Sequence, residues 1–88
     1  VISFTQSTAT AWAGDNVRVN AVAPGLIETE ILSDVNQADL EKIIHATPIP
    51  RMGEPAEVAA MVAFLLSEES NFTTGQTLVI SGGRGMLP

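Results

Sequence analysis

The spacing of apolar residues predicts a chain in which helices and strands alternate. Over residues 1–13 apolar side chains recur at near-helical intervals, and Gly14-Asp15-Asn16 ends the pattern. We expect Gly14 in the left-handed conformation that often follows a helix end. Residues 17–23 then combine small and β-branched residues, with apolar groups on both faces. That composition is typical of a short strand inside a parallel sheet.

A turn and two short helices are predicted after this strand. Pro24 and Gly25 end it, because proline has no N–H for a ladder and glycine lets the backbone turn sharply. Residues 28–44 carry two apolar stripes at helical spacing, which predict two short helices. The first stripe is Ile31, Leu32 and Val35, and the second is Leu40, Ile43 and Ile44.

The remaining segments predict a connector, a longer helix and a second strand. Two prolines exclude a helix interior over residues 47–50, so these residues form an extended connector. Pro55 lies at the start of a helix that is expected to reach about Ser67. A solvated turn is predicted at residues 68–71 and a strand at residues 76–80. The buried stripe of the helix is predicted to be Val58, Met61, Val62, Leu65 and Leu66.

This order of elements predicts the α/β fold class. Two strands joined by a long helical crossover are parallel when they share a sheet. Two such strands alone leave both faces and both edges uncovered, so we expect them to belong to a larger doubly wound parallel sheet. The sequence also starts at Val1, inside a predicted helix and without a capping residue. We therefore expect residues 1–88 to be the carboxy-terminal segment of a single domain whose upstream part is missing.

The amino-acid composition of the chain limits the classes of molecule that it is expected to bind. Hydrophobic residues make up 45% of the 88 residues, which is a high load for a chain with little interior. The net charge of −6, with four scattered basic residues, disfavours nucleic-acid binding. The longest apolar run, residues 58–66, is too short to cross a bilayer. The absence of cysteine excludes disulfides and thiolate metal sites, and it is compatible with a reducing cytosol.

Three segments resemble the carboxy-terminal part of the short-chain dehydrogenases/reductases. Residues 17–25, Val-Arg-Val-Asn-Ala-Val-Ala-Pro-Gly, resemble the sixth strand of that family and its turn, and Thr29 completes a Pro-Gly-x-x-x-Thr pattern. Residues 51–59, Arg-Met-Gly-Glu-Pro-Ala-Glu-Val-Ala, resemble the start of its last large helix. Residues 74–83, Thr-Gly-Gln-Thr-Leu-Val-Ile-Ser-Gly-Gly, resemble its seventh strand. The three matches keep the family's order and spacing, and together they are highly specific.

The resemblance implies a Rossmann-type fold, an NAD or NADP cofactor, and hydride transfer between a hydroxyl and a carbonyl carbon of a small-molecule substrate. It also implies that no catalytic residue lies in this chain, because the family's serine and Tyr-x-x-x-Lys pair would lie upstream of Val1. The sequence agrees: it has no tyrosine, and its only lysine, Lys42, lies outside the helix that carries the family's lysine. The choice between NAD and NADP depends on residues after the family's second strand.

Four residues are predicted to bind the cofactor. By the resemblance, Pro24 and Gly25 pack on the nicotinamide ring, at the sheet edge where α/β proteins bind ligands; the alternative is a plain structural turn. Ile27 matches the position whose backbone N–H and C=O bond the cofactor carboxamide, and its alternative is core packing. The Thr29 hydroxyl would donate to the carboxamide or the pyrophosphate. It is equally suited to capping a helix that begins near Glu30.

The two apolar stripes after this turn have two interpretations. By the resemblance they form the inner face of a mobile lid over the substrate, which would then have an apolar portion. The alternative is ordinary core packing. The residues concerned are Ile31, Leu32, Val35, Leu40, Ile43 and Ile44.

Other polar candidates carry less weight. His45 could line the substrate site, but a lone histidine is more often a surface residue. Glu30 and Asp34 stand four residues apart, and a solvated helix face explains them better than a metal site shared with His45. Residues 82–85, Gly-Gly-Arg-Gly, do not open a helix, so we predict a strand-ending turn near a subunit contact rather than a phosphate loop.

Large apolar residues on the predicted helices are candidates for contacts between subunits. By the resemblance the first helix packs against its copy in a neighbouring subunit, giving a homodimer or homotetramer; the alternative for Phe4, Trp12 and Phe64 is burial within the protomer. The function predicted is a cytoplasmic short-chain oxidoreductase with no nucleic-acid or membrane partner. The rival hypothesis is a truncated or degenerate relative that acts as a structural or interaction subunit.

Overall fold

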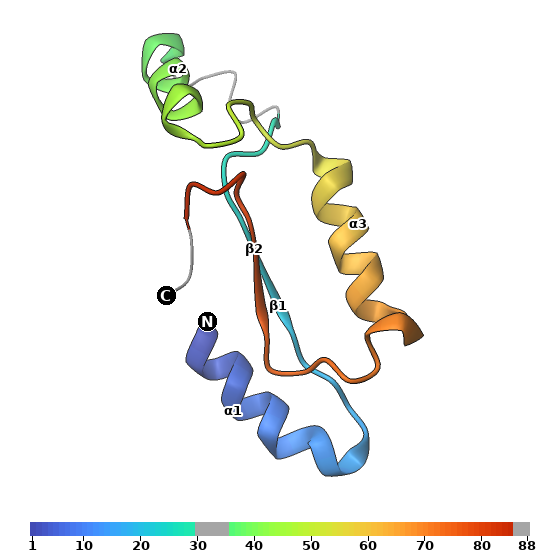
Figure 1. Ribbon diagram of the computed structural model, residues 1–88. Coiled ribbons are helices and arrows are strands. Elements are labelled where there is room, and N and C mark those ends of the chain that lie inside the picture. The colour runs from blue at the N-terminus through green and yellow to red at the C-terminus, as the bar shows by residue number, and fades with distance from the viewer. Residues whose placement is uncertain (30–35, 86–88) are drawn as a thin grey trace.

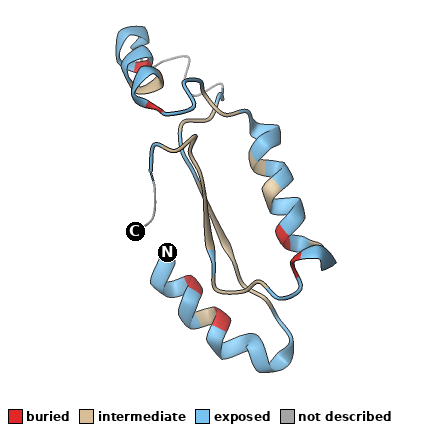
Figure 2. Cartoon of the chain, viewed as in Figure 1, coloured by how far each residue is buried: buried red, intermediate tan, exposed pale blue. Residues whose placement is uncertain are grey.

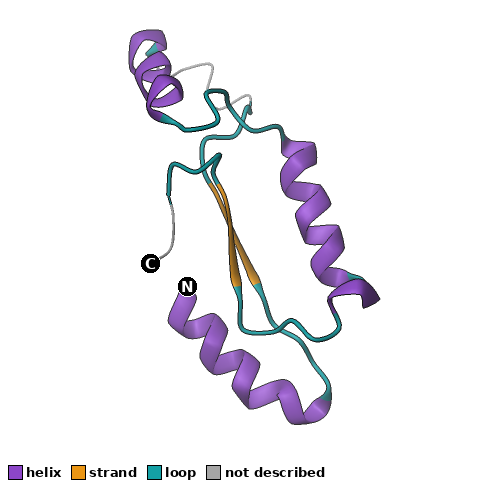
Figure 3. Ribbon diagram, in the orientation of Figure 1, coloured by secondary structure: helices purple, strands orange, loops and turns teal. Residues whose placement is uncertain are grey.

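The computed structural model describes residues 1–29 and 36–85 (Figure 1). Two strands run parallel in the register Ala21↔Thr77 through Pro24↔Ile80. Helices α1 and α3 lie on opposite sides of this sheet, and α2 lies beyond the carboxyl ends of the strands (Figures 1 and 3). The elements in chain order are α1 (Ile2–Trp12), β1 (Ala21–Pro24), α2 (Gln37–Ala46), α3 (Pro55–Leu66) and β2 (Thr77–Ile80), with 3₁₀ helices at Ala13–Asp15 and Glu68–Ser70.

The fold-class prediction is confirmed by this topology. Both predicted strands form and pair in parallel, and the connection between them contains α2 and α3. The connector over residues 47–50 is non-helical, as its prolines predict. Helix α3 starts at Pro55 and is followed by Ser67, as predicted. Of the two short helices predicted in residues 28–44, the second is α2, and the first lies outside the described residues.

The first strand is shorter than predicted, because side chains replace the start of its ladder. Residues 17–20 lie outside β1. The Val19 N–H donates to Thr74 Oγ1 at 3.0 Å, and the Asn20 amide donates to the Thr73 carbonyl at 3.0 Å. Asn20 Oδ1 also accepts the Gln76 N–H at 3.0 Å. The approach to the sheet is therefore held by these polar side chains and by one backbone bond, from the Gly75 N–H to the Val19 carbonyl at 2.7 Å. The apolar pattern of the sequence does not indicate these contacts.

The end of α1 differs from the prediction at Gly14. The chain continues from α1 into the 3₁₀ helix Ala13–Asp15, and the left-handed residue is Asn16, with a φ of 61°. Its N–H donates to the Ala13 carbonyl at 3.0 Å. The extra turn moves the position that needs a positive φ two residues along, and asparagine tolerates that conformation better than most residues.

The predicted stripe of α3 is only partly buried. Leu65 is buried and Val58 and Met61 are half-buried, but Leu66 is 79% exposed and Val62 is 37% exposed. Helix α3 contacts β1 along one narrow face. Val62, Leu65 and Leu66 line one open pocket together with residues 18–22, so Leu66 lies on the side of α3 that faces this segment but is not covered by the described residues.

The segment after α3 was predicted to be solvated, and Ser70 contradicts this. Ser70 is 1% exposed. Its hydroxyl accepts from Arg18 Nη1 at 3.0 Å and lies 2.9 to 3.1 Å from the carbonyl oxygens of Phe64, Leu65 and Ser67. Arg18 Nη2 donates to the Ser67 carbonyl at 3.2 Å. Ser70 is buried because its hydrogen bonds join the end of α3 to the segment before β1.

Little apolar surface is buried among the described residues. The buried apolar side chains there are Ala9, Leu40 and Leu65, scattered over three helices (Figure 2). By contrast Phe4 is 74% exposed and Phe72 is fully exposed. No helix in the described part of the chain is long and apolar enough to span a bilayer.

Candidate functional site

The turn after β1 is packed tightly against the end of β2. Pro24 pairs with Ile80 in the last position of the ladder, and the Gly25 N–H donates to the Ile80 carbonyl at 2.8 Å. A Cβ atom on Gly25 would lie 2.9 Å from both Cα and Cβ of Ser81. Only glycine fits between the two strand ends without a shift of the backbone. Pro24 and Gly25 themselves are exposed at the carboxyl end of the sheet.

The predicted carboxamide position, Ile27, has a defined backbone orientation. Ile27 forms a parallel bridge with Gly53. The Gly53 N–H donates to the Leu26 carbonyl at 2.9 Å, and the Glu28 N–H donates to the Gly53 carbonyl at 2.8 Å. In a trans peptide the C=O and N–H point in opposite directions. The N–H and C=O of Ile27 therefore both point away from Gly53.

Nothing in the described part of the chain bonds these two groups of Ile27. A backbone donor and a backbone acceptor thus lie side by side on one edge of an extended segment. That pair is complementary to a primary amide, which offers one acceptor and two donors. The Ile27 side chain is half-buried and packs over Gly53, where a Cβ atom would lie 2.7 Å from Ile27 Cδ1.

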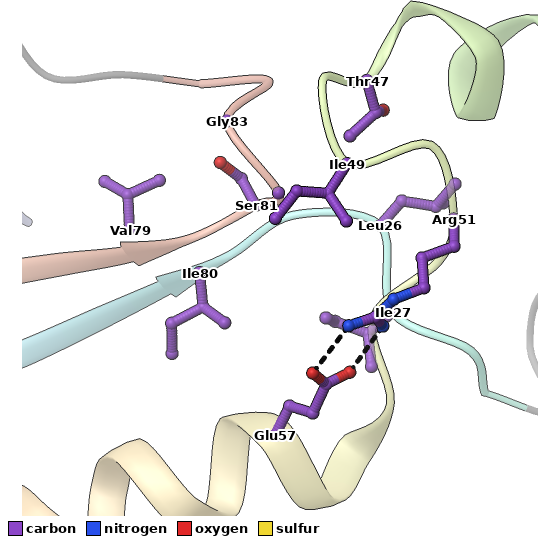
Figure 4. A pocket seen from close by; sticks show the side chains of 12 residues that line it. Leu26, Ile27, Thr47, Ile49, Arg51, Glu57, Val79, Ile80, Ser81 and Gly83 are labelled. Atoms are coloured by element: carbon purple, nitrogen blue, oxygen red, sulfur yellow. Dashed lines mark hydrogen bonds and ion pairs between the residues drawn. The ribbon is translucent and has the colours of Figure 1, made fainter.

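A cavity of about 270 Å³ lies between the sheet end and the connector (Figure 4). The Ile49 N–H donates to the Gly82 carbonyl at 2.9 Å, so the connector is joined to the end of β2. Thr47 is buried, and its hydroxyl donates to the Ile43 carbonyl at 2.8 Å. Residues from both strand ends, the connector and α3 line this cavity, among them Leu26, Ile27, Ile49, Arg51, Glu57 and Ser81.

An ion pair stands on one wall of this cavity. Figure 4 shows Arg51 extending from the connector toward Glu57 on α3. The contact is bidentate, with distances of 2.7 and 2.9 Å from Arg51 Nη1 and Nη2 to the two oxygens of Glu57. Glu57 Oε1 also accepts the Glu54 N–H at 3.0 Å. The hydrogen bond from Arg51, followed by that from the Glu54 N–H, lowers the pKa of Glu57 to about 2.

Comparison with known proteins identifies the chain. The sequence profile of the family described as enoyl-(acyl carrier protein) reductase matches residues 1–84. A chloroplastic tropinone reductase homolog of Arabidopsis thaliana is 47% identical over 82 residues, which are 91% of this chain and 26% of the relative. The chain belongs to this family of short-chain dehydrogenases/reductases.

Two solved structures place the fold within the short-chain dehydrogenase/reductase family. The 3-oxoacyl-[acyl-carrier protein] reductase from Brucella melitensis matches with a TM-score of 0.94 and 41% identity, over 98% of this chain and 32% of that chain. A 4-hydroxyisoleucine dehydrogenase complexed with NADH matches with a TM-score of 0.85 and 30% identity, over 94% of this chain and 35% of that chain. The predicted part of a Rossmann-type sheet is therefore confirmed. The chain spans 26% to 35% of the length of these three relatives.

The remaining predicted site residues differ in their exposure, and some of them lie outside the described residues. Thr29 is exposed. Leu40 is buried on α2 and Ile44 is half-buried, which fits a core role as well as the face of a lid. The other lid candidates, Ile31, Leu32 and Val35, lie outside the described residues. Their assignment to a lid stays a prediction, as do the cofactor roles of Pro24, Gly25, Ile27 and Thr29.

The minor candidates lie only partly within the described residues. His45 is exposed in the last turn of α2. Glu30 and Asp34 lie outside the described residues, and in the rest of the chain no cluster of three potential metal ligands occurs. The turn at residues 82–85 packs its first glycines against Thr47, Pro48 and Ile49 of the connector.

Sequence reasoning missed the Arg51–Glu57 pair as a unit. Arg51 and Glu57 both lie in the segment that carried the family resemblance, but the residues were assigned only to a helix start. A positive and a negative residue on either side of that start was the available signal. That signal does not indicate that Gly53, which lies between the two residues, pairs with Ile27.

Proposed function

We propose that this chain forms the nicotinamide side of an oxidoreductase that transfers hydride between NAD(P)(H) and a carbonyl or alcohol substrate. Two comparisons and one structural observation support the proposal. The chain belongs to the short-chain dehydrogenase/reductase family, and a related dehydrogenase was solved with NADH. The observation that carries it is the pair of Ile27 backbone groups that point away from Gly53.

The residues present fit a nicotinamide. The N–H and C=O of Ile27 would hold its carboxamide, and the exposed Pro24-Gly25 turn would support the ring. Holding the carboxamide at two points fixes which face of the ring is presented to the substrate, and such orientation is the main task of a protein in cofactor chemistry. The bound cofactor would supply the hydride.

Proton transfer is assigned to other parts of the protein. Residues 1–88 contain no tyrosine, and Lys42 is exposed on α2. We place the acid/base tyrosine, its lysine and the substrate-orienting serine elsewhere, with residues 1–88 as the carboxy-terminal segment of a single NAD(P)-binding domain. Thr29 would bind the cofactor, and Ile31, Leu32, Val35, Leu40 and Ile44 would cover the substrate.

Assembly and location are part of the same proposal. Phe4 is 74% exposed and Trp12 is 51% exposed on α1, which supports a homodimer or homotetramer built partly on that helix. The proposed location is the cytoplasm, and the cysteine-free sequence is compatible with that reducing compartment. Sedimentation of the intact protein tests the first point.

Ile27 offers a direct test of cofactor binding. Ile27→Pro removes the N–H that points away from Gly53, and neither bond of Gly53 to Leu26 and Glu28 uses that N–H. We expect the KM for NADH or NADPH to rise roughly tenfold or more, the effect of about 1.4 kcal/mol. The matched control, Ile27→Val, keeps the backbone and should bind like the parent. The measurement is oxidation of the reduced cofactor by the intact protein with a 3-oxoacyl thioester or tropinone, the substrates that the relatives' names suggest.

The rival function, a non-catalytic interaction subunit, is favoured by one observation. Large apolar residues on α1, α3 and the following loop are exposed, among them Phe4, Leu66 and Phe72. If intact, folded protein binds neither NADH nor NADPH, the oxidoreductase proposal fails and the interaction role replaces it.

A further inference from the structure

We propose that Arg51 and Glu57 act as a positioning clamp for the cofactor-binding backbone at Ile27. The inference rests on the proposed function and adds to it a pair of residues remote from the predicted contacts. Neither side chain would touch the cofactor. Both would act through Gly53, whose backbone is the bridge partner of Ile27.

The first link of the clamp fixes the turn before α3. Arg51 bonds both oxygens of Glu57 and donates to the Met52 carbonyl at 3.1 Å. Glu57 in turn accepts the Glu54 N–H. Main-chain groups on both sides of Gly53 are therefore tied to one two-pronged ion pair, and an Arg–carboxylate fork restricts orientation more than a single bond does.

The second link of the clamp connects the turn at Gly53 to the backbone of residues 26–28, where the cofactor is proposed to bind. Gly53 exchanges two backbone hydrogen bonds with the segment around Ile27, at 2.9 Å from its N–H and 2.8 Å to its carbonyl. The bonds hold the Leu26 and Glu28 peptide groups, whose opposite ends are the Ile27 N–H and C=O. A rotation of the turn at Gly53 would turn both of these groups away from the carboxamide.

Burial indicates that the pair serves position rather than overall stability. The Arg51 and Glu57 side chains are 54% and 42% exposed. Exposed ion pairs contribute little to folding, because water screens them. A bidentate pair whose hydrogen bonds hold main-chain groups on both sides of Gly53 is better explained by the geometry that it imposes on Gly53.

The main test is Glu57→Gln in the intact protein. Glutamine can still accept the Glu54 N–H, but it removes the charge that holds the Arg51 fork. We expect the KM for NADH or NADPH to rise roughly fivefold to tenfold, with kcat changed less than about twofold and an unaltered thermal midpoint. Glu69→Gln, which makes the same charge change at an exposed residue of the Glu68–Ser70 helix, is the matched control and should match the parent.

A double-mutant cycle separates the pair from two independent residues. If Arg51 and Glu57 act together, Arg51→Gln and the double variant should raise the KM by the same factor as Glu57→Gln. Arg51→Lys keeps the charge without the fork and should give an intermediate KM. It also keeps the test decisive if the glutamine variants fold poorly.

The outcomes distinguish this inference from the proposed function. A parent that binds neither cofactor overturns both. A parent that binds cofactor, with a Glu57→Gln variant of unchanged KM or with additive effects in the cycle, overturns the clamp alone. Equal effects of Glu57→Gln and Glu69→Gln also overturn it, because they would mean a general response to charge.

Discussion

At the scale of single residues, the site depends on close contacts between backbones. Gly25 lies so near Ser81 that an added methyl group would lie 2.9 Å from the backbone Cα and from the Cβ of Ser81. Gly53 lies equally near Ile27, but there the overlapping atom is the end of a flexible side chain. The two glycines therefore have different roles. Gly25 allows two strand ends to lie close together, whereas Gly53 leaves room for a side chain that can rotate.

Gly25→Ala is expected to destabilise the intact protein by about 1–3 kcal/mol, the usual cost of overpacking, because the ends of β1 and β2 must separate. Gly14→Ala is the control: nothing lies within 4 Å of its added methyl, and its φ is not positive. The control should be neutral or stabilising by about 0.4–1 kcal/mol. Urea denaturation measures both changes. Equal stability of the two variants would contradict the close contact.

Prediction of single residues from the sequence failed where side chains bond to residues far along the chain. Ser70 looked like part of a solvated turn, yet it is buried against Arg18, 52 positions away. Serine and arginine are usually exposed, and no local pattern announces a partner that far along the chain. A second failed prediction involves only local structure: Asn16 adopts the left-handed conformation in place of Gly14, because α1 is followed by one additional 3₁₀ turn.

At the scale of elements, the start of α3 combines a proline, an acidic first turn and the Arg51–Glu57 pair. The sequence predicted this start because each of its local signals favours a helix amino end. What it did not predict is that the preceding turn pairs with residues 26–28, so that one helix start and one strand end form a single unit.

This unit has a defined pH dependence. The pKa of Glu57 lies at about 2, below its ordinary value of 4.5. The exposed pair contributes little to overall stability. Because the folded pKa is the lower one, that small contribution is complete above about pH 4.5 and is lost as the pH falls toward 2. A carboxyl NMR titration should place the Glu57 midpoint near pH 2 in the parent protein. Arg51→Gln should move it up toward 4.5, and a parent midpoint already at 4.5 would contradict the ion pair.

At the scale of the whole molecule, the chain is open. Its radius of gyration is 15.4 Å, whereas a compact domain of this length would have about 12 Å. Its extents are 49 × 24 × 22 Å. Two parallel strands with one helix on each side leave both sheet edges uncovered by other strands in the described part of the chain, and such sheets are normally buried on all sides.

Residues 1–88 expressed alone are therefore expected to lack a cooperative thermal transition and to bind a hydrophobic dye. The segment makes up about a third of the Brucella melitensis relative, and an intact protein of that size should melt in a single sharp transition. Scanning calorimetry of both makes the comparison. A monomeric 88-residue chain with a sharp transition would show that the described contacts suffice for folding.

The sequence by itself determined the order of elements, the parallel pairing and the family, because each rests on local patterns: apolar periodicity, the position of prolines, and three motifs in fixed order. It also pointed to Pro24, Gly25, Ile27 and Thr29 as the cofactor side of the molecule. The tertiary structure decided that Ile27 pairs with Gly53, that Arg51 and Glu57 stand behind that pair, and that Arg18 and Ser70 join α3 to the sheet. These contacts link residues that lie 26 or 52 positions apart (Ile27 to Gly53, Arg18 to Ser70), and only the path of the backbone brings such residues together.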